Sequence, residues 1–265
     1  VLDDANQPEQ AIQNTIKLIK KENVDILFSF TGTDTTFAAM PIIIKHNTPL
    51  FFPFSGAHYF HDGDIGQSIY HWRPNYFEET RALVRYLIKN KTNRIAVYYE
   101  KNSDGYSGLL GVKKALKYYR KKLNTTVSID EKDNQISDFE NDALLLLKNK
   151  PTAIICVTSP EASAGIIKAI RKTSNIPIAT LSKVDYKTMN RLLENNRTFL
   201  NQLVVSQVVP TQRINKNYKY YKKTVRKPYD PIVYEGYLNT IRLMQLLKAN
   251  SLAKLKRNHL KISKD

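Results

Sequence analysis

Cysteine, tryptophan and glycine are scarce in this sequence. The 265 residues include one cysteine, one tryptophan and nine glycines. The single cysteine, Cys156, excludes an internal disulfide, and its apolar surroundings in the sequence are typical of a buried thiol. No apolar run approaches the ~20 residues that a membrane-spanning helix needs. A positively charged start followed by an apolar segment is also lacking, so we expect no signal peptide within this sequence.

The motifs of common catalytic and nucleotide-binding sites are lacking as well. There is no Walker A pattern, no G-x-S-x-G elbow and no H-E-x-x-H helix. Gly105, Gly108 and Gly111 are spaced G-x-x-G-x-x-G, which differs from the dinucleotide fingerprint and favours a turn followed by small residues on a packed helix face. We therefore predict that the protein is not an enzyme and needs no cofactor.

One cluster of potential metal ligands is present. It lies in a predicted polar loop at residues 58–67 and consists of His58, His61, Asp62 and Asp64. We favour a solvated loop over a metal site for this cluster.

Acidic residues are outnumbered by basic ones. The sequence has 41 lysines and arginines against 24 aspartates and glutamates, a formal net charge of +17. Such a balance is compatible with binding to nucleic acid, anionic lipid or acidic ligands. The lysines are spread along predicted solvent-facing positions, as in 17–21, 113–122 and 216–227, which favours a solvated surface over a dedicated basic face. An anionic-polymer binder, the alternative, would lose affinity steeply with salt.

What the sequence does contain is an alternation of short apolar runs with amphipathic segments. Strands alternating with helices of this length indicate an α/β fold, with parallel sheets covered by helices on both faces. The strands are too numerous for one small sheet, so we expect two Rossmann-like lobes with crossings near Arg73-Pro74 and Val209-Pro210. Trp72 at the first crossing is interpreted as hinge packing rather than as a ligand platform. Strands are predicted at 25–30, 50–54, 68–73, 94–99, 125–129, 153–157, 176–181 and 203–208, and helices at 7–22, 37–45, 77–89, 108–122, 136–148, 160–173, 184–194, 215–225 and 232–248.

Residues 25–57 are the part of the chain around which this pattern is organised. Two predicted loops, 31–36 and 55–57, leave the carboxyl ends of adjacent parallel strands, where open α/β sheets bind ligands. Hydroxyl groups and free backbone N–H groups at a helix N-terminus suit a small anion such as a carboxylate. Thr35 and Thr36 also suit helix capping, and the two roles do not exclude each other.

Asp104 is a second candidate position, in a predicted loop after the strand 94–99. Its carboxylate would either anchor a cationic group of a ligand or end the turn, and the sequence favours neither.

Successive blocks along the chain resemble one family, the branched-chain amino-acid-type substrate-binding proteins of ABC transporters, which have the type I periplasmic binding fold. The blocks include Asp3-Asp4-Ala5, Thr31-Gly32-Thr33, Pro53-Phe54-Ser55-Gly56-Ala57, Glu79-Thr80-Arg81-Ala82-Leu83-Val84 and Tyr234-Glu235-Gly236-Tyr237. Each block is weak alone, but their order and spacing together are specific.

The resemblance implies two lobes joined by three crossovers, with the ligand held between them by hinge closure. Lobe one is expected at 1–74 plus 211–265 and lobe two at 75–210. The resemblance also implies a chain truncated at both ends, without the first strand of lobe one.

The resemblance also implies a set of contact residues. Ser55, Gly56 and Ala57 would hold the ligand's amino-acid backbone, with Thr33, Thr35 and Thr36 in the neighbouring loop. From lobe two, the matching positions are Asp104, Ser159, Glu161 and Ser182. An aromatic residue is usual in the family where Asp104 stands here, and an acidic group is frequent near Ser182. We hypothesise that Asp104 or Glu161 pairs with a ligand ammonium.

The function implied is a periplasmic solute-binding component of an ABC importer. It would capture a small polar metabolite such as an amino acid or amide, and its partner would be the transporter permease, with no nucleic acid involved. The same fold serves as a ligand-sensing module in receptors and regulators, which is the main alternative.

Overall fold

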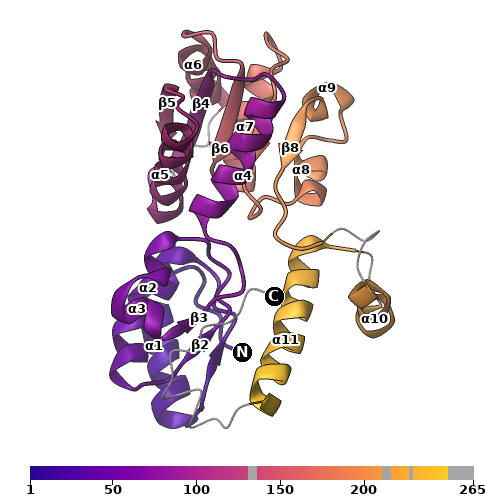
Figure 1. Cartoon of the computed structure of the whole chain (residues 1–265). Helices are drawn as coiled ribbons and strands as arrows, with labels where there is room; N and C mark the ends of the chain where they lie inside the picture. Colours follow the sequence, from indigo (N-terminus) through magenta and orange to yellow (C-terminus); the bar gives the residue numbers. More distant parts are fainter. Residues whose placement is uncertain (131–135, 211–215, 227–228, 250–265) are drawn as a thin grey trace. The chain divides into compact units, whose positions relative to one another are not determined.

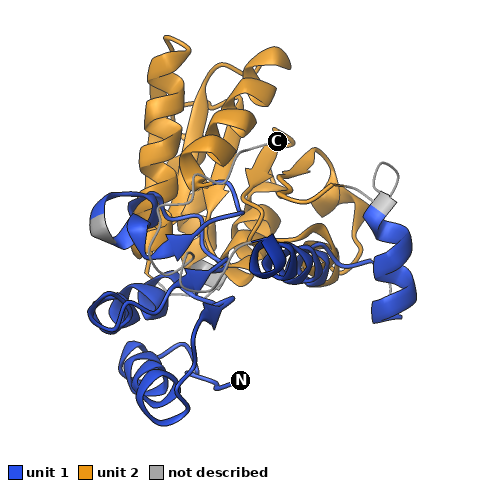
Figure 2. Ribbon diagram, turned by 60° about the horizontal axis from the view of Figure 1, so that its bottom comes forward, with its two compact units in different colours: residues 1–74, 216–265 blue, residues 75–215 orange. Residues whose placement is uncertain are grey.

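The computed structural model describes residues 1–130, 136–210, 216–226 and 229–249. The chain divides into two compact units, residues 1–74 with 216–265 and residues 75–215 (Figure 2). Each unit is built around a parallel sheet flanked by helices, which confirms the predicted α/β class. Within the described ranges, no helix combines the length and apolar character required to cross a membrane. The predicted helix start at residue 215 lies outside the described residues.

Unit 1 contains a three-stranded parallel sheet of order β1-β2-β3. One face packs against α2 and the π-helical turn that follows α1, through a core that includes Met40, Ile43 and Leu50, and the other face receives Leu243 and Leu246 from α11. The two helical layers explain why its strands are short apolar runs without alternation. The elements are α1 (Pro8–Ile16), a π-helical turn (Lys17–Lys21), β1 (Leu27–Phe28), α2 (Thr33–Lys45), β2 (Leu50–Phe51), a 3₁₀ helix (His58–His61), α3 (Gly63–Gln67), β3 (Ile69–Tyr70), α10 (Lys216–Val225) and α11 (Pro231–Ala249).

The segment 58–67 is helical rather than the predicted polar loop. A 3₁₀ helix and α3 occupy it, and the fully buried Phe60 anchors the segment in the core. His71 reinforces this position through a 2.8 Å hydrogen bond between its Nε2 and the Phe60 carbonyl oxygen. The helices were not predicted because the segment is polar: among its side chains that the structure describes, only that of Phe60 is fully buried.

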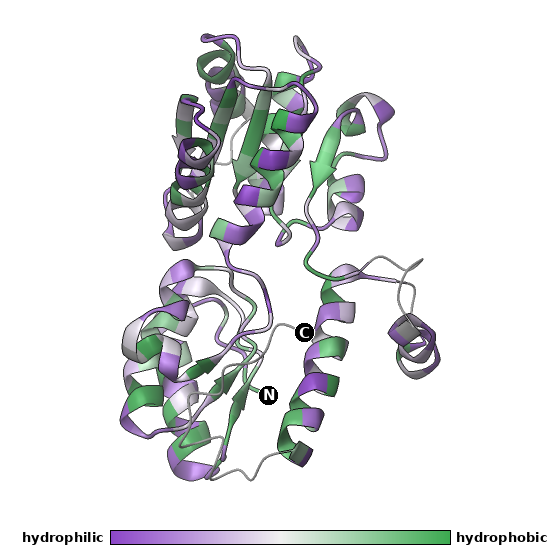
Figure 3. Ribbon diagram, in the orientation of Figure 1, coloured by the Kyte–Doolittle hydropathy of each residue, from purple (hydrophilic) through white to green (hydrophobic). Residues whose placement is uncertain are grey.

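Unit 2 contains a five-stranded parallel sheet of order β5-β4-β6-β7-β8. Successive residues of each strand face opposite sides: Ala96 and Tyr98 pack toward α6, α7 and α8, whereas Ile95 and Val97 pack toward α4 and α5. These helices are labelled beside the sheet in Figure 1. β6, all of whose residues are buried, is drawn in the green of hydrophobic residues in Figure 3. The elements are α4 (Tyr76–Lys89), β4 (Ile95–Glu100), α5 (Ser103–Tyr118), β5 (Leu123–Ile129), α6 (Ile136–Leu147), β6 (Ala153–Val157), α7 (Pro160–Ile170), β7 (Ile178–Thr180), α8 (Tyr186–Leu192), α9 (Arg197–Leu200) and β8 (Leu203–Val205).

Helix α5 begins at Ser103, five residues before the predicted start at 108. Asn102 caps it, because its Oδ1 accepts a 2.9 Å hydrogen bond from the Gly105 N–H. All three glycines of the G-x-x-G-x-x-G pattern therefore lie inside the helix, so the predicted packed face is confirmed and the predicted turn is wrong. A Cβ on Gly105 would lie 1.8 Å from the Glu100 carbonyl oxygen. Only glycine lets this helix start so close to the end of β4.

Candidate ligand-binding loops

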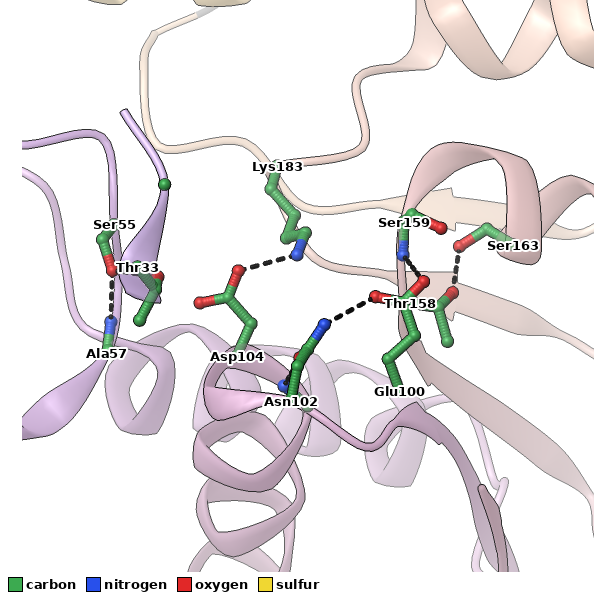
Figure 4. Close-up of polar contacts among 12 residues, drawn as sticks. Thr33, Ser55, Ala57, Glu100, Asn102, Asp104, Thr158, Ser159, Ser163 and Lys183 are labelled. Carbon is green, nitrogen blue, oxygen red and sulfur yellow. Dashed lines mark hydrogen bonds and ion pairs between the residues drawn. The ribbon is translucent and has the colours of Figure 1, made fainter. Parts of the chain in front are cut away.

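In unit 1, the loop after β1 and the loop after β2 meet through their side chains. The hydroxyl oxygens of Thr33 and Ser55 lie 2.7 Å apart, and both side chains are buried. The Ala57 N–H donates to the Ser55 hydroxyl oxygen at 3.2 Å (Figure 4). The parallel register of β1 and β2 causes this meeting, because it brings the carboxyl ends of the two strands to the same edge.

Backbone donors accompany these hydroxyl groups. Gly32 precedes α2 with a φ of 87°, a conformation that favours glycine, and as a glycine it supplies no side-chain cap to the helix. Ser55 and Gly56 are buried, and in the part of the chain that the structure describes no residue accepts a hydrogen bond from either backbone N–H. Buried N–H groups are nearly always paired, so these two are available to an oxygen atom of a ligand.

Thr35 and Thr36 do not cap α2. Both lie inside the helix, where the Thr35 hydroxyl donates to the Thr31 carbonyl oxygen at 2.9 Å and the Thr36 hydroxyl to that of Gly32 at 2.6 Å. The expected capping role is therefore wrong, because the helix begins at Thr33, two residues before Thr35 and three before Thr36. Both hydroxyl groups therefore bond to carbonyl oxygens of residues just before the helix, in the i→i−4 pattern that threonine adopts inside helices.

In unit 2, a buried carboxylate joins the loops after β4 and β6. Glu100 accepts a 2.8 Å hydrogen bond from the Ser159 N–H and a 3.1 Å bond from the Asn102 side-chain amide (Figure 4). Its side chain is almost completely buried, so these donors replace the water that a carboxylate otherwise requires. Glu100 thereby fixes Ser159, one of the predicted contact residues, at the edge of the sheet.

Asp104 forms an ion pair with Lys183. The Lys183 Nζ lies 2.7 Å from Asp104 Oδ2, and the two side chains are 19% and 17% exposed. Asp104 lies in the first turn of α5 rather than in the predicted loop, and Lys183 lies in the loop after β7. The pair therefore links the carboxyl ends of two strands and leaves part of each charged group accessible.

Ser182 is bonded to a second buried carboxylate. Its hydroxyl donates to Glu79 Oε2 at 3.0 Å, and its backbone N–H donates to Oε1 of the same side chain. Ser206 also donates to Glu79, which lies on α4. The remaining predicted residue, Glu161, is exposed in the first turn of α7.

The profile of the Periplasmic binding protein family matches residues 1–253. The chain belongs to this family. The resemblance found in the sequence is thereby confirmed. A comparison with curated protein sequences finds no match.

Solved structures share the fold of this periplasmic binding protein. A possible leucine/isoleucine/valine-binding protein from Rhodopirellula baltica SH 1 superposes with a TM-score of 0.85 at 24% identity, covering 96% of this chain and 72% of that one. A solute-binding ABC transporter protein from R. palustris, in complex with benzoate, gives 0.75 at 18% identity over 96% and 71%. A fatty acid ABC transporter substrate-binding protein from Thermomonospora curvata gives 0.72 at 19% identity over 90% and 61%.

Four residues that organise these loops in the periplasmic binding protein were not predicted from its sequence. They are Glu79, Glu100, Asn102 and Lys183. A charged residue ending the apolar strand IAVYYE was a signal for Glu100, and Asn102 three residues before Gly105 was a signal for a helix cap. Nothing in the sequence connects Glu79 with Ser182, which lies 103 residues further along the chain.

Proposed function

We propose that this periplasmic binding protein is the solute-binding component of an ABC importer and acts outside the cytoplasm. We further propose that its ligand is a small carboxylate-bearing molecule, either an amino acid or a related polar metabolite. The membership of the family supports the first statement. The observation that carries the second is the group of buried donors in the loops after β1 and β2.

A carboxylate matches these donors chemically. The Ser55 and Gly56 N–H groups lack acceptors within the described residues, and the Thr33 and Ser55 hydroxyl groups lie beside them. A carboxylate accepts several hydrogen bonds, and bonds to a charged acceptor are roughly twice as strong as neutral ones. Benzoate, fatty acids and branched-chain amino acids, which the names of the similar structures mention, all carry this group.

The loops of unit 2 would supply the remaining contacts. We propose that Asp104, Ser159, Glu161 and Ser182 bind the same ligand when the two units close around it. An amino-acid ligand would bring an ammonium to Asp104, which at present is paired with Lys183. A ligand without an ammonium would leave that ion pair in place, so the contribution of Asp104 distinguishes amino acids from simple carboxylates.

The test is a thermal-shift screen followed by titration calorimetry. The compounds are branched-chain amino acids, benzoate and medium-chain fatty acids, each compared with its amide. A ligand at ~100 times its dissociation constant adds about 2.7 kcal/mol to the free energy of unfolding and raises the melting temperature. We expect carboxylates to bind and their amides to bind at least tenfold more weakly. Equal affinity for an acid and its amide would refute the carboxylate assignment.

Variants locate the binding site. Ser55→Ala should weaken binding about tenfold to a hundredfold, the loss of a hydrogen bond to a charged group. Ser128→Ala, on strand β5, is the matched control and should leave affinity unchanged. Asp104→Asn should weaken an amino acid and spare benzoate. Unchanged binding in Ser55→Ala would place the ligand elsewhere.

A further inference from the structure

Unit 2 has a cavity at the edge of its sheet opposite to the candidate ligand-binding loops. Its volume is about 660 Å³. The lining residues precede β7 and β8, whereas Ser182 and Lys183 follow β7, and the two strands are parallel. The cavity is therefore separate from the loops discussed above. It is lined by Arg171, Thr173, Ser174, Asn175, Arg197, Thr198 and Asn201.

Arg171 is the buried cation of this cavity, with 8% of its surface exposed. Its guanidinium donates to three carbonyl oxygens, those of Ser174 at 3.4 Å, Ile176 at 3.0 Å and Asn201 at 2.6 Å. These bonds brace the two loops that lead into β7 and β8. A guanidinium has five N–H donors, so two remain. One of these is on Nε, which is buried and has no partner among the described residues.

The positive charge of Arg171 has no carboxylate counter-ion among the residues that the structure describes. Within the described ranges, no carboxylate lies within 4 Å of the guanidinium of Arg171 or Arg197. Burial lowers the pKa of Arg171, which reflects the cost of keeping this charge away from water. Buried charges in proteins are normally paired, and an uncompensated one is strongly destabilising. The carbonyl partners explain the position of the side chain but do not neutralise it.

The remaining lining favours an anion from solution. Arg197 is exposed and adds a second guanidinium, while Thr173, Ser174, Asn175, Thr198 and Asn201 are neutral and polar. The lining contains no aspartate or glutamate and no large apolar side chain. Arginine donors in a fixed fork suit the oxygen atoms of phosphate and carboxylate.

We infer that this cavity binds a small oxyanion, either inorganic phosphate or a simple carboxylate, through Arg171 and Arg197. This site is distinct from the one in the proposed function and does not depend on it. Occupancy would neutralise Arg171 and stabilise the loops before β7 and β8.

The test is a titration of the full chain with sodium phosphate and, separately, with sodium acetate. Sodium chloride at equal ionic strength is the reference, and the melting temperature and calorimetric heat are the measurements. We expect saturable stabilisation by one of the two oxyanions beyond that given by chloride. The comparison of phosphate with acetate identifies the oxyanion.

Arg197→Gln is the variant of choice, because Arg197 is exposed and its replacement should not affect folding. It should weaken oxyanion binding at least tenfold. Arg85→Gln, an exposed arginine on α4, is the matched control and should bind as the original protein does. Arg171→Gln should abolish oxyanion binding. If this variant does not fold, the comparison of Arg197→Gln with Arg85→Gln still shows whether the cavity binds the oxyanion.

Two results would overturn the inference. The first is the same phosphate response in Arg197→Gln and Arg85→Gln, which would indicate general screening of a basic surface. The second is competition between the oxyanion and the transported solute, which would place the oxyanion at the candidate ligand-binding loops. Failure to find any solute would leave the result at this cavity unaffected.

Discussion

The ion pair between Arg73 and Glu235 allows a sharp test of how unit 1 is held together. Arg73 Nη1 lies 2.6 Å from Glu235 Oε2, and their side chains are 3% and 6% exposed. The guanidinium also lies over the Phe54 ring, 4.4 Å from its centre. The two residues are 162 positions apart, so the pair connects α11 to the segment after β3.

Glu235→Gln removes the negative charge that lies 2.6 Å from the buried Arg73 guanidinium. Removing one partner of a buried pair costs roughly 3–5 kcal/mol. Arg73→Met should cost a similar amount, with about 0.5–2 kcal/mol more from the lost contact with Phe54. The double variant Arg73→Met with Glu235→Leu removes both charges and should be close to the original stability, since apolar replacement of a whole pair is often neutral.

Trp72 provides the assay. It is the only tryptophan and lies next to Arg73, so its fluorescence in a urea titration reports on unit 1, while far-UV circular dichroism reports on both units. The exposed pair Lys172–Glu140 in unit 2 is the control, and Glu140→Gln should change the free energy of unfolding by about 1 kcal/mol or less. A loss below about 1 kcal/mol in Glu235→Gln, or a double variant as unstable as the single ones, would refute the argument.

Three further predictions concern single positions. Burial raises the pKa of the Cys156 thiol to about 12, so a thiol reagent at pH 8 should modify the protein only at the rate of unfolding, as mass spectrometry would show. Burial, as the main cause, lowers the pKa of His71 to about 3, below the 6.5 of the unfolded chain, so the unfolded state binds more protons between these values. The free energy of unfolding should then fall by up to about 1.4 kcal/mol per pH unit from pH 6.5 toward pH 3, and His71→Gln should flatten this dependence in urea titrations. Gly105→Ala should lower the melting temperature sharply because of the contact with the Glu100 carbonyl, whereas Gly236→Ala, which meets nothing within 4 Å, should raise it by stabilising α11. Equal shifts for the two glycine variants would contradict that reasoning.

Apolar periodicity predicted the elements best where one element buries a continuous stripe or run. The predicted strand 153–157 coincides with β6, and the predicted helix 77–89 differs from α4 by one residue at its start. Asn75 and Glu78 form a capping box that starts α4 at Tyr76, a sequence signal that the prediction of a start at 77 did not use. Short elements were harder: α9 was not predicted, and its four residues are too few to show a period.

The sequence by itself determined the α/β class, the family and the loops from which ligand contacts are expected, because these depend on local patterns and on the order of blocks along the chain. Only the tertiary structure decided what each polar side chain does. It paired Asp104 with Lys183 and bonded Ser182 to Glu79, although each partner is about 80 or more residues away in the chain. It also buried Arg171 without a carboxylate partner in the described part of unit 2. The physical reason is that hydrogen bonds and ion pairs depend on distances of a few ångströms across the fold, which no spacing in the sequence specifies.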